Sequence, residues 1–154
     1  MLRLNKYFFL ILCLTAVPLF AQAPERSMST AQEIETLLSA KTVTYAQAAR
    51  FVLEASNALA TDNHEEAFNY AVQQDWLPKK LSSDDSARLN NISLLLMRSF
   101  KLKGGIMYAI TNSPHYAYRE LVYLNVIQNR SDPSVLVSGE QLLYYINRIL
   151  AREF

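Results

Sequence analysis

The sequence has few of the residues on which many functional sites depend. Of its 154 residues only three are glycine and one, Cys13, is cysteine. An average chain of this length would have about eleven glycines. This scarcity argues against glycine-rich phosphate-binding loops and disfavours a turn-rich β-fold. Hydrophobic residues make up 51% and charged residues 19%, which is not the balance of a disordered chain. The length allows one domain or one array of repeats.

Motifs of the common catalytic classes are also missing. The sequence has no nucleophile elbow, no P-loop and no dinucleotide-binding fingerprint. His64 and His115 are far apart and have no metal-ligand spacing. The acidic pairs Glu65–Glu66 and Asp84–Asp85 lie near predicted helix starts, where negative charge complements the helix dipole. We therefore expect no enzymatic site, no metal and no cofactor; a hydrolase that uses a carboxylate pair is the minor alternative.

The N-terminal segment has the pattern of a secretory signal. Arg3 and Lys6 precede an uncharged apolar run, Tyr7–Phe20, which is followed by Ala21-Gln22-Ala23. Small residues at these two alanine positions are what a signal peptidase reads, so residues 1–23 are predicted to be cleaved after Ala23. The run has about 14 residues, short of the roughly 20 that span a bilayer. We expect an exported protein of the periplasm or the cell surface.

Cleavage would leave 131 residues without cysteine, with thirteen lysines and arginines against fourteen aspartates and glutamates. A chain this close to neutral lacks the basic footprint of a nucleic-acid-binding protein. It also has no run of basic residues of the kind that attracts anionic lipid, and no transmembrane segment remains. Residues 24–30 are polar and predicted to be a flexible tail.

Residues 31–154 are predicted to form a single all-α domain with six or seven helices. Capping boxes begin two of them, Thr44 with Gln47 and Ser138 with Gln141. Asp62 with Glu65 resembles a third box. Ser113 followed by Pro114 is a cap with proline at the first helical position. The helix over 87–103 has apolar residues on most of its surface and is expected to be central, with Gly104 as its C-terminal cap. Residues 106–110 are predicted to be a short helix.

The chain matches itself in chemical class at two offsets. A shift of 50 residues aligns the segment from Ala67 with that from Ala117, and a shift of 44 aligns Ala48 with Ile92. Asp75 and Asn125 then fall where a helix must end, in a left-handed conformation that Asn and Asp tolerate. The pattern predicts three helix–loop–helix repeats, about 31–60, 63–103 and 114–152, in a pseudo-threefold arrangement or a short helical array.

These units resemble the S-layer homology repeat. Residues 43–48 (VTYAQA) and 137–142 (VSGEQL) are similar to the opening of its second helix, and residues 116–121 with 125–127 to the helix and turn before it. The resemblance implies an exported envelope protein that binds an acidic cell-wall polymer. It would do so through an Arg after the cap residue and a nearby Trp. Here Tyr45, Leu89 and Gly139 occupy the Arg positions, and Trp76 lies in the comparable region.

Tyrosines are the one unusual enrichment. Eight lie beyond the signal, and half of these fall between residues 108 and 123. Tyrosine is favoured where an apolar body meets a wet edge, and it anchors binding interfaces. The candidate ligand-binding groove comprises Trp76, Tyr116, Tyr118, Arg119 and Arg130. The alternative is that the tyrosines are half-buried residues at the edges of a helical core.

The leading interpretation is an exported, non-enzymatic module of the cell envelope. It would bind a cell-wall glycan or peptidoglycan, or anchor to the envelope. The alternative is a periplasmic protein–protein interaction or scaffold module of helical repeats that binds no glycan. The predicted partner is therefore a cell-wall polymer or an envelope protein, and not a nucleic acid.

Overall fold

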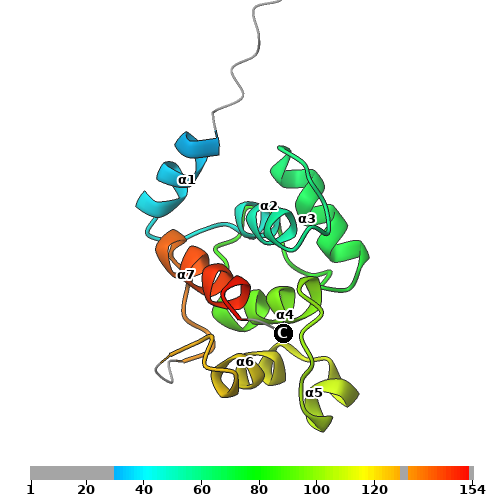
Figure 1. The fold of residues 1–154 in the computed structure, drawn as a ribbon. Coiled ribbons are helices and arrows are strands. Elements are labelled where there is room, and N and C mark those ends of the chain that lie inside the picture. Colours follow the sequence, from blue (N-terminus) through cyan, green and yellow to red (C-terminus); the bar gives the residue numbers. More distant parts are fainter. Residues whose placement is uncertain (1–29, 129–131, 153–154) are drawn as a thin grey trace, which may run out of the picture.

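The computed structural model describes residues 30–128 and 132–152, and this part of the chain is all-helical (Figure 1). The predicted signal peptide over 1–23, residues 24–29 of the predicted tail, and Arg130 lie outside the described residues. The helices are α1 Thr30–Ser39, α2 Tyr45–Ala55, α3 His64–Gln73, α4 Leu89–Ser99, α5 Ile106–Thr111, α6 Pro114–Tyr123 and α7 Gly139–Leu150. Within the same residues there is no strand, only two isolated bridges, so the predicted all-α class is confirmed.

Most predicted helix starts are confirmed, and one is displaced. Both capping boxes form, at Thr44 before α2 and at Ser138 before α7, and the Ser113 side chain caps α6. Asn63, not Asp62, caps α3 by accepting from the backbone amides of Glu65 and Glu66. Asp62 is one residue too early, and its carboxylate instead pairs with Arg50.

Four helices end in the same way, with a left-handed residue and a backbone hydrogen bond that spans the last turn. The left-handed residues are Asn57, Asp75, Lys101 and Asn125, with φ between 53° and 55°. In each case the next amide donates to a carbonyl five residues earlier, as from Trp76 to Ala71 and from Val126 to Leu121. The expectation for Asp75 and Asn125 is confirmed. The expected cap at Gly104 is wrong, because α4 ends at Ser99 and Lys101 takes the left-handed position.

The long-range packing joins helices of different predicted units. Helix α3 packs mainly on α2, α6 on α4, and α1 on α7, while α2 also contacts α4 and α7. The two helices of a predicted unit are therefore not the ones in closest contact. In the second and third predicted units, residues 74–88 and 124–138 separate the two helices. Contact between α1 and α7 brings the first and last helices together (Figure 1).

Three backbone hydrogen bonds close a ring at the centre of this arrangement. Val43 N donates to the Val137 carbonyl at 2.9 Å, Ala87 N to the Val43 carbonyl at 2.8 Å, and Val137 N to the Ala87 carbonyl at 2.9 Å. All three residues are buried. They immediately precede the N-cap residues Thr44, Arg88 and Ser138. The starts of helices α2, α4 and α7 therefore lie next to one another.

The core follows from the apolar stripes of these elements. Helix α4 is central as predicted, with nearly every residue from Leu89 to Ser99 buried. The buried face of α3 is Ala67, Phe68 and Ala71, and that of α6 is Ala117, Tyr118 and Leu121. A shift of 50 residues relates these two sets, and the turn residues Leu77 and Ile127, which are also buried, share it.

One connection carries an additional element. The segment between α2 and α3 covers residues 56–63, whereas that between α4 and α6 covers residues 100–113, six residues more. The longer segment contains α5, the predicted short helix, which packs on α6. Figure 1 places α5 at the edge of the molecule, at the opposite end from α1.

Candidate binding groove between α5 and α6

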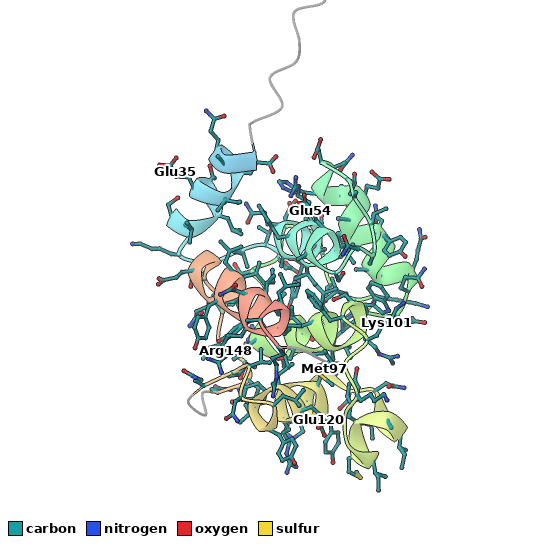
Figure 2. The ribbon with its side chains drawn as sticks, in the orientation of Figure 1. Glu35, Glu54, Met97, Lys101, Glu120 and Arg148 are labelled. Atoms are coloured by element: carbon teal, nitrogen blue, oxygen red, sulfur yellow. The ribbon has the colours of Figure 1, made fainter. Side chains whose placement is uncertain are left out.

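Helices α5 and α6 enclose an open groove of about 560 Å³. Two of the predicted site residues, Tyr116 and Arg119, line it. The other lining residues come from the segment before α5, from α5 itself, from the second half of α6 and from the residue after it: Lys103, Gly104, Gly105, Ile106, Met107, Glu120, Tyr123 and Leu124. Figure 2 marks Glu120 on α6. The groove therefore combines aromatic and aliphatic surface with two cations and one carboxylate.

The amphipathic pattern of α6 places these side chains. Ser113 caps the helix and Pro114 occupies its first turn. The helix packs on α4 through its buried residues Ala117, Tyr118 and Leu121. The opposite face carries Tyr116, Arg119 and Tyr123 toward the groove. The Arg119 guanidinium carbon lies 5.8 Å from the centroid of the Tyr116 ring, a cation–π distance. This contact fixes an aromatic face and a cation side by side.

Gly104 and Gly105 form the floor of the groove, and their lack of a side chain lets this segment lie close to α6. A Cβ at Gly104 would lie 2.5 Å from Cδ1 of Tyr108, so only glycine lets that ring pack where it does. A Cβ at Gly105 would meet Oε1 of Glu120 at 3.0 Å, which is the end of a flexible side chain. The Glu120 carboxylate thus lies against the backbone of the segment before α5.

A polar group is buried behind this floor. Tyr108 is 6% exposed, and its hydroxyl has no hydrogen-bond partner within residues 30–128 and 132–152. Burial raises the pKa of Tyr108, the Arg98 charge opposes this shift, and the Glu120 charge adds to it. The Arg98 Nε atom is buried and lacks a partner as well. The space between α4, α5 and α6 therefore holds polar atoms that the described part of the chain does not satisfy.

The remaining predicted site residues do not line the groove. Tyr118 is 7% exposed and belongs to the core, on the buried stripe of α6. Trp76 follows α3 and packs edge-on against Tyr70, with ring centroids 5.8 Å apart. The structure thus brings together Tyr116 and Arg119 and places Trp76 elsewhere, while Arg130 is among the residues that it does not describe.

The three positions that the family resemblance assigns to a polymer-binding Arg lie inside the fold. Tyr45, Leu89 and Gly139 are all buried. The Tyr45 hydroxyl accepts from Asn91 Nδ2 at 2.6 Å and from the Arg88 amide at 3.2 Å. A Cβ on Gly139 would lie 1.6 Å from the Leu37 carbonyl oxygen. These positions serve helix packing in this chain.

An ion-pair cluster around Arg50 has no counterpart in the sequence-based candidates. Arg50 is buried on α2, and its guanidinium pairs with Glu33 at 2.8 Å, Glu54 at 2.5 Å and Asp62 at 3.2 Å. It also lies 5.0 Å from the centroid of the Phe51 ring. One signal for this cluster was visible in the sequence, which is that Arg50 lies inside the apolar stripe of its helix. The cluster links α1 and the segment before α3 to α2.

The face of α3 provides an internal comparison for the groove. A smaller depression of about 470 Å³ there is lined by Leu59, Asn63, Glu65, Glu66, Asn69, Tyr70 and Gln73. Fifty residues after Glu66, Asn69 and Gln73 come Tyr116, Arg119 and Tyr123. Positions that lie fifty residues apart on these two helices thus differ in chemistry, acidic and amide on α3 but aromatic and basic on α6.

The described residues form neither a cluster of metal ligands nor a membrane-spanning helix. No group of three or more metal-ligating side chains comes together within the described ranges. The helices there are too short and too polar to cross a bilayer. No known protein family, curated protein or solved structure matches the chain.

Proposed function

We propose that this chain is an exported, non-enzymatic module of the cell envelope, and that its α5–α6 groove binds a cell-wall glycan. The observation that carries the proposal is the arrangement of Tyr116, Arg119 and Tyr123 along one open groove with Lys103 and Glu120. Aromatic rings offer an apolar surface on which a sugar ring can stack. The cations and the carboxylate supply hydrogen-bond partners for its hydroxyl and acidic groups.

The proposed scaffold is three copies of one helix pair: α1 with α2, α3 with α4, and α6 with α7. The N-cap residues that precede α2, α4 and α7 are spaced by 44 and 50 residues. The same spacings relate the left-handed residues Asn57 to Lys101 and Asp75 to Asn125. Such agreement of turn chemistry at fixed offsets supports repeats of the S-layer homology type, closed around a pseudo-threefold axis.

The proposed ligand contacts differ from those that the resemblance implies. The positions after the N-caps are occupied by packing residues, and the groove lies beside α5, in the one connection that is longer by six residues. In this proposal the scaffold is retained while the binding surface has moved to α6 and α5. Export rests on the signal pattern over residues 1–23.

Sedimentation with purified peptidoglycan sacculi tests the proposed function. The wild-type protein is expected to sediment with the sacculi, and the double variant Tyr116→Ala/Arg119→Ala to lose about tenfold or more in affinity. The matched control is Glu66→Ala/Asn69→Ala, which removes exposed side chains at the equivalent positions of α3 and should bind like wild type. Trp76→Ala should have little effect, because Trp76 lies off the groove.

Retention that is unchanged in Tyr116→Ala/Arg119→Ala would contradict the assigned groove. No retention of the wild-type protein would contradict glycan binding itself and favour the alternative, a protein-interaction module.

A further inference from the structure

Helix α5 presents an apolar edge to solvent. Ile106 is 78% exposed, Ile110 73% and Met107 50%, and Tyr123 beside them on α6 is 81% exposed. Ile106 and Ile110 are four residues apart, one above the other on the helix. Within this helix Tyr108 alone is buried, against Gly104. Three large apolar side chains on a six-residue element therefore form an exposed apolar patch.

The charges beside this edge are mainly positive. Residues 100–113 include Lys101 and Lys103, both exposed, and no acidic residue. Arg119 of α6 lines the same groove as Lys103 and is also exposed. The Glu120 carboxylate is the nearby opposing charge, and it lies half-buried against Gly105. These cations are dispersed along the sequence, which is why no basic run is visible there, but the fold brings Lys103 and Arg119 together beside Ile106 and Met107.

We propose that the edge formed by Ile106, Met107 and Ile110 docks on an anionic lipid surface. Helix α5 would lie in the interface, with its aliphatic side chains among the acyl chains. Lys103 and Arg119 would lie at the level of the headgroups, where anionic lipid attracts them. Tyr123 is suited to the same boundary, because its ring is apolar and its hydroxyl is polar.

The size of the patch distinguishes a lipid surface from a second copy of the chain. A six-residue helix is about 9 Å long, whereas a stable protein interface buries about 800 Å² on each partner. Helix α5 and Tyr123 offer only a fraction of that area. A bilayer needs no matching shape, so a short helix at the edge of the molecule, where Figure 1 places α5, can insert without other contacts.

Flotation with lipid vesicles tests the proposal on the protein purified after expression of the full chain. Vesicles of phosphatidylcholine with about one quarter phosphatidylglycerol are compared with vesicles of phosphatidylcholine alone. The wild-type protein is expected to bind the anionic vesicles about tenfold more strongly, and Ile106→Ser/Ile110→Ser to lose that binding. Leu150→Ser is the matched control, because Leu150 is a large exposed apolar residue of α7, and it should bind normally.

A second readout reports insertion directly. In the variant Ile110→Trp/Trp76→Phe the single tryptophan sits on the α5 edge, and its emission should shift to shorter wavelength with anionic vesicles. An unshifted emission would overturn the proposal. So would absent vesicle binding, or equal losses in Leu150→Ser and Ile106→Ser/Ile110→Ser. Self-association that Ile110→Ser abolishes would overturn it in favour of a second copy.

The outcome is separable from glycan binding. Ile110 does not line the α5–α6 groove, so Ile110→Ser should weaken vesicle binding while leaving sedimentation with sacculi unchanged. Tyr116→Ala should do the reverse.

Discussion

At the residue scale, Tyr45, which follows the N-cap of α2, serves helix packing. Tyr45 reaches from the start of α2 to the start of α4, where its hydroxyl accepts from the buried amide of Asn91 and from the backbone of Arg88. The link spans more than forty residues of sequence and lies in the buried region near the ring of backbone hydrogen bonds. A single phenolic oxygen thus joins two of the three helices that begin there.

Tyr45→Phe should lower the free energy of unfolding by about 1–3 kcal/mol, because it leaves the buried Asn91 amide without its acceptor. Urea unfolding of wild type and variant measures the change. Tyr108→Phe is the matched control. It removes an equally buried hydroxyl that has no partner within the described residues, so its stability should be equal to or higher than that of the wild type. Equal losses in both variants would mean that the Tyr45 hydrogen bonds contribute nothing specific.

The same Tyr108 hydroxyl should make stability depend on alkaline pH. An unfolded tyrosine has a pKa of about 10, whereas burial raises the pKa of Tyr108 in the folded protein. The folded state therefore resists losing the proton, and the free energy of unfolding should fall as the pH rises above about 10. Unfolding measured between about pH 8 and 11.5 should show a shallower decline for Tyr108→Phe than for the wild type. Parallel curves would contradict a buried, neutral Tyr108.

At the element scale, local chemistry determines where helices begin and end, and the sequence reveals most of it. The boxes at Thr44 and Ser138 and the turns at Asp75 and Asn125 depend only on neighbouring residues, so they could be predicted. Asp62 was expected to cap α3, but Arg50 from another element draws its carboxylate away. Lys101 adopts a left-handed conformation because the helix end requires one, even though lysine has no preference for it.

The candidate groove was also predictable only in part, because some of its residues are brought together by contacts between elements. Tyr116 and Arg119 lie on the face of α6 opposite its apolar stripe, and that stripe can be read from the sequence. Tyr118 lies on the stripe, and its counterpart Phe68 was a signal that it would be buried. Lys103 and Tyr123 could not be assigned, because their approach depends on where the segment before α5 folds back.

Helix α1 is attached at few points, and one of them is Gly139. The Leu37 backbone occupies the place where a Cβ of residue 139 would lie, and the Gly139 amide donates to the Ala40 carbonyl at 3.0 Å. The Arg50–Glu33 ion pair is a second attachment. Because α1 otherwise packs on α7, its position depends on close backbone contact at the start of that helix.

Gly139→Ala should therefore displace α1 and destabilise the protein by about 1–3 kcal/mol, because a backbone atom has to move. Limited proteolysis should cut the variant within residues 30–42 faster than it cuts the wild type. Gly105→Ala is the control, since the atom that it meets ends the flexible side chain of Glu120. Unchanged proteolysis of Gly139→Ala would show that α1 does not depend on this contact.

At the scale of the whole molecule, the order in which helices pack could not be read from the sequence. Apolar stripes show that a helix has a buried face, but not which helix covers it. The repeat pattern alone does not say whether the two helices of a proposed unit pack on each other. In the structure the first helix of each proposed unit packs on the second helix of another unit. Helix α3 packs on α2, α6 on α4, and α1 on α7. This exchange makes the three proposed units depend on one another.

Native-state hydrogen exchange of three amides tests this closed, threefold account most directly. The amides of Val43, Ala87 and Val137 form the central ring, and opening any unit would break at least one of its bonds. If the units are equivalent and interlocked, all three amides should exchange only through global unfolding, with free energies equal to that from urea unfolding. Exchange of one of them about a hundredfold faster than the other two would contradict the account.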